Sequence, residues 1–255
     1  MKLNFRKIGE SGQPIIILHG LFGMSDNWLT ISKFFAINHL VYILDLRNHG
    51  QSPQSDEFGY QEMADDLAEL IVDQKLEKPI LIGHSMGGKV IMQFAIDHSN
   101  LADKLIIVDI APKFYPVHHT SLLQGLHTIQ LENLQSRTEA NDILKRFEES
   151  EGVRQFLLKN LYRNPETSQF GWRFNLPVLT REIANIGQEI NTNQQIINKT
   201  LFIYGSESSY ILEEDFAKIK AIFLYTLFKE INGAGHWVQA DKPKEFVETV
   251  LKFID

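Results

Sequence analysis

Short apolar runs alternate along this chain with stretches that carry apolar residues at helical spacing. Residues 14–20, 39–46, 79–85, 104–112 and 199–205 are short and apolar enough to be buried strands of a parallel sheet. Apolar residues recur at helical spacing at 27–37, 60–76 and 87–98, and again in the closing KPKEFVETVLKFI. Because strand and helix alternate, we predict an α/β fold whose mostly parallel sheet is flanked by helices.

The alternation breaks between residues 113 and 186, where helical stretches follow one another without a strand between them. A chain of 255 residues suits one large domain or a core with a modest insertion. We therefore predict a core made of residues 1–111 and 187–255, with a helical cap inserted at 112–186.

Composition and charge exclude several kinds of partner. The formal net charge is -7 without a long Lys/Arg block, which argues against nucleic acid and anionic membranes. The chain has no cysteine, so it forms neither disulfides nor thiolate metal sites. The first residues lack the apolar core of a secretory signal, and no run reaches the roughly 18 apolar residues of a spanning helix. We expect a cytoplasmic protein without stable membrane insertion.

The stretch GHSMGG fits the pattern G-x-S-x-G through Gly83, Ser85 and Gly87. It stands directly after an apolar run and directly before a helical stretch, the context in which a serine is exposed on a sharp turn. Glycines two residues to either side leave room for that turn, and the helix N-terminus favours developing negative charge. The pattern predicts Ser85 as a nucleophile.

A serine hydroxyl needs a base that takes its proton. His236 stands in the Gly-rich stretch NGAGHWV before the final helix, late in the chain, where such a base is expected. His84 neighbours Ser85, but we expect its side chain to project away at the turn. The other histidines considered are those of the predicted cap and those near element ends, namely His118, His119, His127, His39, His49 and His98. We expect these at surface or structural positions and predict His236 as the base.

An oxyanion hole needs backbone N–H groups close to the developing charge. The stretch LHGLFG at 18–23 follows an apolar run, and its glycines allow close approach of a substrate oxygen. The expected donors are the N–H groups of Leu21 and Met86. Nearby, Asp45 and Arg47 in DLRNHGQS are expected to brace a loop, and Asp66 is expected on a solvated helix face.

The motifs LHGLFG, DLRNHGQS, GHSMGG and GAGHW, in this order, resemble the α/β-hydrolase superfamily across nearly the whole chain. Within it, HGLFGMSDNW, DLRNHGQSP, VDIAP and WRFNLP are similar to the YbfF-type esterases. That resemblance implies a cofactor-free serine hydrolase acting on small-molecule acyl esters and, as for some members, acyl-CoA thioesters. No spacing of His and carboxylates indicates a metal site.

Three carboxylates are candidates for the acid that orients His236. Many α/β-hydrolases carry it as G-x-x-D after the run at 199–205, but Ser208 stands at that position and cannot hold a charge. Either Glu207 or Glu213 replaces it, or Asp109 does, as in superfamily branches that place the acid after the run at 104–112. We favour Asp109, because it ends a strand at the sheet edge where the site should gather.

These residues predict a two-step acyl transfer with Ser85, His236 and Asp109 as catalytic residues. The resemblance implies esters as substrates, and we expect small to medium acyl chains. The residues expected to line the substrate pocket are Phe22, Phe114, Tyr115, Trp172, Phe174 and Leu176. A carbon–carbon hydrolase and a perhydrolase would use the same triad. A catalytically silent receptor of the same fold is the alternative suggested by Ser208.

Overall fold

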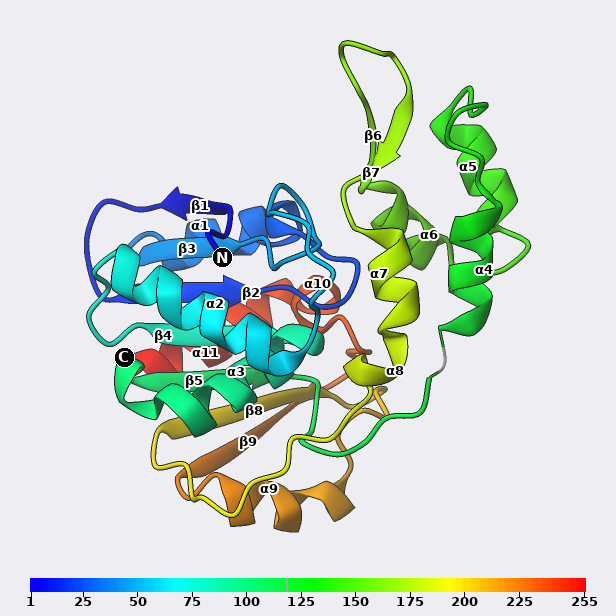
Figure 1. Cartoon of the computed structure of the whole chain (residues 1–255). Coiled ribbons are helices and arrows are strands. Elements are labelled where there is room, and N and C mark those ends of the chain that lie inside the picture. The colour runs from blue at the N-terminus through cyan, green and yellow to red at the C-terminus, as the bar shows by residue number, and fades with distance from the viewer. Residues whose placement is uncertain (118) are drawn as a thin grey trace.

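The computed structural model describes residues 1–117 and 119–255, and His118 lies outside them. A seven-stranded sheet runs through the molecule with helices on both faces (Figure 1). Its order is β1-β3-β2-β4-β5-β8-β9; β1 is antiparallel to β3 and the other neighbours are parallel. The strands are β1 (Phe5–Ile8), β2 (Pro14–Leu18), β3 (Leu40–Leu44), β4 (Ile80–His84), β5 (Lys104–Val108), β8 (Lys199–Gly205) and β9 (Thr226–Ile231). The predicted α/β fold with a mostly parallel sheet is confirmed.

The five predicted strands are the interior ones, and the two edge strands were not predicted. All five residues of β4 are buried, because helices cover both faces of a parallel sheet and the strand therefore reads as one apolar run. In β1 no residue is fully buried, and in β9 only the last one is. An edge strand of this kind leaves no continuous apolar signal in the sequence.

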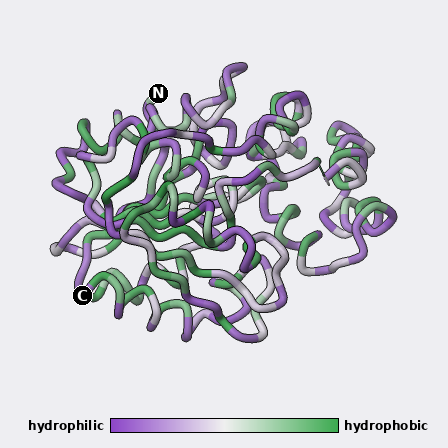
Figure 2. The backbone as a smooth tube through the Cα atoms, turned by 90° about the horizontal axis from the view of Figure 1, so that it is seen from below, coloured by the Kyte–Doolittle hydropathy of each residue, from purple (hydrophilic) through white to green (hydrophobic). Residues whose placement is uncertain are grey.

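The side chains of neighbouring residues in one strand pack on opposite faces of the sheet. In β2, Ile16 and Leu18 join the apolar cluster of α2 (Tyr60–Asp73) and α3 (Met86–His98). Ile15 and Ile17 join the cluster of α1 (Leu29–Phe35) and α11 (Pro243–Ile254). The remaining core elements are η1 (Ser25–Trp28), η2 (Ser99–Leu101), η3 (Glu213–Asp215), α9 (Phe216–Ile222) and α10 (Val238–Asp241). Figure 2 shows hydrophobic residues concentrated along the central strands.

A group of five helices and a hairpin, here called the cap, stands at one end of the sheet (Figure 1). It contains α4 (Thr120–Thr128), α5 (Arg137–Leu144), α6 (Glu151–Leu158), α7 (Leu176–Arg181), α8 (Ile183–Ile186) and the strands β6 (Leu161–Arg163) and β7 (Phe170–Trp172). The expectation of helices alone differs from the structure, because β6 and β7 pair as an antiparallel hairpin. With three residues each, these strands are too short to show a period in the sequence.

The cap shares the apolar core of the sheet. Leu126, Leu157 and Leu179 of the cap belong to the same buried cluster as Leu81 and Leu105 of the strands. Within residues 1–117 and 119–255, every helix is too short or too polar to cross a bilayer.

Candidate active site

Ser85 sits at a sharp turn between β4 and α3. Its backbone angles are φ 53° and ψ -119°, a region that non-glycine residues rarely adopt, and its N–H donates to Val108 O at 3.0 Å. A Cβ added to Gly83 would lie 2.4 Å from the carbonyl oxygen of Gly87. One added to Gly87 would lie 2.6 Å from the carbonyl oxygen of His19. Only glycines therefore permit the turn that exposes this serine.

Asp109 follows the last residue of β5 and directs its carboxylate to His236. Its Oδ2 lies 2.7 Å from His236 Nδ1, and the side chain is fully buried. Its backbone also adopts a positive φ, 50°, fixed by an N–H bond to Ile203 O at 2.8 Å. Glu207 and Glu213 are exposed at the surface. Within the described part of the chain, Asp109 is the only carboxylate within hydrogen-bond distance of this imidazole.

Ser208, in the loop after β8, contacts Asp109 directly. Its hydroxyl donates to Asp109 Oδ2 at 2.5 Å, and its oxygen accepts the N–H of Tyr210 at 3.2 Å. Gly205 N donates to the other carboxylate oxygen at 3.2 Å. Sequence reasoning considered Ser208 only as a missing acid. A serine in a loop gives no signal of its own that it supports an acid located 99 residues earlier.

His236 lies in the loop between β9 and α10, between two aromatic rings. The Tyr210 ring stacks on it with centroids 3.8 Å apart and 16° between planes. The His84 ring lies 4.7 Å away, and its Nε2 bonds the His236 carbonyl oxygen at 2.8 Å. We expected the His84 side chain to project away from the turn, but its ring lies beside His236. Gly20 has no Cβ and therefore leaves room for this ring. Burial lowers the pKa of His84 to about 3, so it is neutral at pH 7 and its Nε2–H is the donor.

The carbonyl oxygen of Gly20 is held by two donors. Gly23 N donates to it at 2.9 Å, and His19 Nδ1 lies 2.8 Å from it. His19 Nε2 accepts the N–H of Leu46 at 3.0 Å, so Nδ1 carries the hydrogen. In a trans peptide the N–H points opposite to the C=O, so the Leu21 N–H is aimed away from these partners.

The N–H groups of the two predicted oxyanion donors are unpaired within residues 1–117 and 119–255. Among the described residues, no acceptor bonds the N–H of Leu21 or of Met86, the first residue of α3. Both residues line the cavity that also contains Ser85 and His236. Two free N–H groups beside a serine can accept the charge of a tetrahedral oxygen.

A cavity of about 940 Å³ lies between the cap and the sheet edge. Phe22 and Tyr115 line it, as predicted from the sequence. Its further walls include apolar side chains that the sequence did not single out, such as Trp28, Ile31, Ile110, Leu122, Val153, Phe156, Ile183, Ile186 and Trp237. Helical periodicity marks such residues as buried but not as facing a cavity.

Four aromatic or apolar residues predicted to line the pocket do not do so. Phe114 is 59% exposed. Phe174 is buried behind Phe22, with ring centroids 5.2 Å apart, and Trp172 stacks on Phe174. Leu176 is buried in the core cluster. Trp172, Phe174 and Leu176 pack behind the wall, in or near the hairpin and α7, whereas Phe114 faces solvent.

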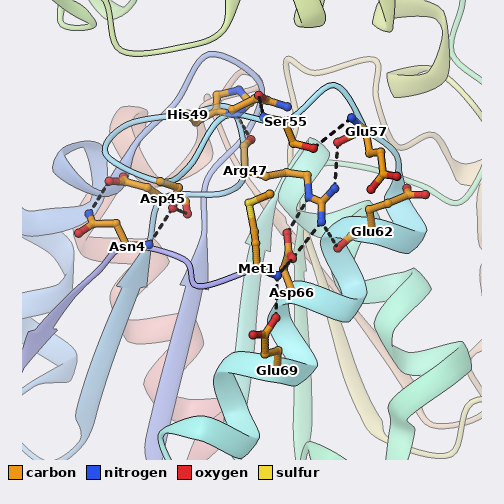
Figure 3. A network of polar contacts seen from close by, with 12 residues as sticks. Met1, Asn4, Asp45, Arg47, His49, Ser55, Glu57, Glu62, Asp66 and Glu69 are labelled. Atoms are coloured by element: carbon orange, nitrogen blue, oxygen red, sulfur yellow. Dashed lines mark hydrogen bonds and ion pairs between the residues drawn. The ribbon is translucent and has the colours of Figure 1, made fainter.

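Asp45 and Arg47 brace loops, as expected (Figure 3). Arg47 binds Asp66 through two nitrogens at 2.7 and 2.9 Å and also donates to the carbonyls of Glu57 and Glu62. Asp45 accepts N–H groups from residues 25 and 51. The prediction that Asp66 lies on a solvated face is wrong, because this guanidinium reaches it from the neighbouring loop and buries it.

Potential metal ligands are not clustered in the part of the chain that the structure describes. No group of three or more His, Asp or Glu side chains there is arranged to hold an ion.

Comparison with known proteins identifies the family. Residues 13–243 match the family model described as the alpha/beta hydrolase fold. The chain is 35% identical over 261 residues to Esterase YbfF of Escherichia coli, covering 100% of both chains. It is 35% identical over 251 residues to the sn-1-specific diacylglycerol lipase ABHD11 of Danio rerio, covering 94% of this chain and 78% of that one. A solved structure titled "Marine microorganism esterase" superimposes with a TM-score of 0.96 at 40% identity, covering 99% of each chain. The chain therefore belongs to the α/β-hydrolase family.

Proposed function

We propose that this chain is a serine hydrolase that cleaves carboxylic esters through an acyl-enzyme, with Ser85 as nucleophile, His236 as base and Asp109 as acid. The relatives named esterase and lipase support the reaction class, which is carboxylic ester hydrolysis. The observation that carries the assignment of residues is the 2.7 Å contact between Asp109 and His236, next to a cavity that contains Ser85.

The first half of the reaction forms the acyl-enzyme. Asp109 accepts the Nδ1–H of His236, which leaves Nε2 free to take the proton of Ser85. Ser85 Oγ attacks the ester carbonyl, and the N–H groups of Leu21 and Met86 stabilise the oxyanion. The tetrahedral species collapses as His236 gives its proton to the leaving alcohol or thiol.

The second half releases the acid. Water enters, gives a proton to His236 Nε2 and attacks the acyl carbon, and Ser85 leaves with that proton. Asp109 stabilises the imidazolium that forms in both halves. No step needs a cofactor.

The proposed substrate is an ester, or an acyl thioester, with a small to medium acyl chain. The apolar walls from both cap and core favour an acyl chain in the cavity. In this proposal residues 1–111 and 187–255 form the catalytic core, and the insertion at 112–186 encloses the acyl group.

Hydrolysis of p-nitrophenyl acetate, butyrate and octanoate tests the proposal. We expect Ser85→Ala to reduce the rate to background and Asp109→Asn to reduce kcat by about 10³- to 10⁴-fold. Glu207→Gln and Glu213→Gln are matched controls, because both carboxylates are exposed, and they should retain the wild-type rate within about twofold. Circular dichroism checks that each variant folds.

Two outcomes would contradict the proposal. Loss of activity in Glu207→Gln or Glu213→Gln, with Asp109→Asn unaffected, would move the acid to the loop after β8. If wild type and Ser85→Ala were equally inert on every ester, and the wild type were not labelled by a fluorophosphonate, the fold would serve as a ligand receptor instead.

A further inference from the structure

Phe22, in the turn that carries the oxyanion donor Leu21, has a left-handed backbone. Its φ is 59°, a conformation that a bulky residue keeps only where its surroundings hold it there. The residue is 3% exposed and lines the cavity. The two polar groups of its backbone must therefore find partners within the protein.

The partners of these two groups come from different parts of the molecule. The Phe22 N–H donates to His49 Nε2 at 3.2 Å, from a core loop. The Phe22 carbonyl oxygen accepts a hydrogen bond from Asn160 Nδ2 at 2.8 Å, and Asn160 stands in the cap between α6 and β6. The cap thus reaches across the cavity edge and holds the turn on one side.

Asn160 is itself fixed in place. Its side chain is 1% exposed, and Nδ2 also lies 3.3 Å from the carbonyl oxygen of Leu157. Its backbone N–H donates to that same carbonyl oxygen at 3.0 Å, and its own carbonyl oxygen accepts the N–H of Arg173 at 2.9 Å. The amide nitrogen therefore faces two carbonyl oxygens, which only a donor can satisfy.

Two trans peptides connect this bond to the oxyanion donor. The Phe22 carbonyl and the Gly23 N–H belong to one peptide and point in opposite directions. Because Asn160 holds the carbonyl, the Gly23 N–H is directed at Gly20 O, which it meets at 2.9 Å. Gly20 O belongs to the peptide that carries the Leu21 N–H, so its direction sets where that donor points.

We propose that Asn160 is a positioning residue of the oxyanion hole, through which the cap holds the Leu21 N–H in its reactive orientation. The inference rests on the proposed function, since it concerns the same site. It gives the cap a part in charge stabilisation in addition to enclosing the acyl group.

The test uses two variants and one control in the full chain. Asn160→Asp keeps the size of the side chain but removes both donors, and Asn160→Ala removes them without burying a charge. The control is Arg181→Ala, which removes an exposed contact between cap and core, from Arg181 Nη2 to the Asp56 carbonyl oxygen at 2.6 Å. Arg181 does not line the cavity.

The expected result is a change in kcat and in loop dynamics together. With p-nitrophenyl butyrate, both Asn160 variants should lower kcat by about tenfold or more and leave KM within about twofold of the wild-type value. This loss is smaller than the roughly 10²- to 10³-fold loss that follows removal of an oxyanion donor itself. Amide hydrogen exchange at residues 19–24 should become faster in both variants. Arg181→Ala should change neither kcat nor exchange in this segment.

Three results would overturn the proposal. One is unchanged kcat and exchange in both Asn160 variants. Another is faster exchange with unchanged kcat, which would make Asn160 a structural anchor. The third is an equal loss of kcat in Arg181→Ala. If the wild type hydrolysed no ester and resisted fluorophosphonate, the proposed function would fail, whereas exchange at residues 19–24 would still decide whether Asn160 holds the turn.

Discussion

The Asp109 carboxylate is fully buried, yet three donors surround it. His236 Nδ1 and the Ser208 hydroxyl contact Oδ2, and Gly205 N contacts Oδ1. A buried ionised group is tolerated only where hydrogen bonds replace its water. Ser208 therefore supplies one of the hydrogen bonds that this buried carboxylate would otherwise make to water.

We expect Ser208→Ala to weaken catalysis without unfolding the protein. A hydrogen bond to a charged group contributes about 1.5–3 kcal/mol, so its loss should lower kcat/KM by about 10- to 100-fold. Hydrolysis of p-nitrophenyl butyrate measures this effect. The matched control is Ser206→Ala, since Ser206 is an exposed hydroxyl whose partners are at positions 232 and 233, not at the acid. Equal rates in the two variants would contradict the prediction.

At the scale of residues, motifs predicted Ser85 and His236, and a strand-end position favoured Asp109, but the sequence did not show the contacts that surround these residues. The G-x-S-x-G pattern spans only five residues, so it can be found in the sequence, although Gly87 is required by clearance from His19 after β2 and only Gly83 by clearance within the turn. Ser208 and Asn160 act across 99 and 138 residues of sequence. Their side chains are ordinary polar ones, so only the folded arrangement shows what they contact.

At the scale of elements, Lys89 joins α3, the helix that follows Ser85, to both connections of the cap. It lies on α3 and is 1% exposed. Its Nζ donates to the carbonyl oxygen of Lys113 at 3.0 Å on one connection, and to those of Gly187 at 3.3 Å and Gln188 on the other. Nζ also lies 4.8 Å from the centroid of the Tyr115 ring. Burial lowers the pKa of Lys89 to about 7, while the three carbonyl oxygens favour its charged form.

Lys89→Met should loosen these two connections. The carbonyl oxygens of Lys113 and Gln188 lose this ammonium donor, whereas the Gly187 oxygen keeps the N–H of Tyr115 at 2.8 Å. A hydrogen bond to a charged group contributes about 1.5–3 kcal/mol. We expect thermolysin to cleave the segments 112–117 and 182–190 at least about tenfold faster, because local opening exposes them. Lys104→Met is the control, since Lys104 Nζ bonds the Ile254 carbonyl at 2.5 Å, at the C-terminal end of α11. Digestion that is equally fast in both variants would show that the lysine does not hold the connections.

The elements that could be predicted are those whose burial leaves a regular pattern of apolar residues in the sequence. Interior strands such as β4 read as apolar runs because both faces are covered, and α11 shows one apolar stripe. The edge strands and the β6–β7 hairpin show no such pattern in the sequence, because their residues are only partly buried or the strands are too short. The walls of the cavity escaped prediction for a related reason, because cap and core contribute single residues from many elements.

At the scale of the whole molecule, buried neutral histidines link folding to pH. Burial lowers the pKa of both His49 and His84 to about 3, from an ordinary value near 6.5. Between these two pH values the unfolded chain binds a proton at each histidine that the folded protein does not. Protonation then favours unfolding, so this contribution to stability is complete above about pH 6.5 and is lost as the pH falls toward 3.

Urea unfolding at pH 7.5 and at pH 5.5 measures this linkage. Each of the two histidines should lower the free energy of unfolding by about 1.4 kcal/mol over that interval. The His84→Gln variant should therefore lose about 1.4 kcal/mol less than the wild type between the two pH values. His127→Gln, at an exposed cap position, should lose as much as the wild type. An identical loss in His84→Gln and in the wild type would rule out this role for His84.

The position of Asp109 also has a kinetic consequence. The contacts that fix its carboxylate join it to Gly205 and His236, which lie 96 and 127 residues further along the chain. Closing such long loops lowers the entropy of the chain before any stabilising contact forms. Contacts between residues so far apart in the sequence therefore form slowly. The strands before the cap can pair locally while Asp109 still lacks both of these partners. In a refolding chain, helical and sheet content should therefore recover first, and the ability to turn over substrate should return last.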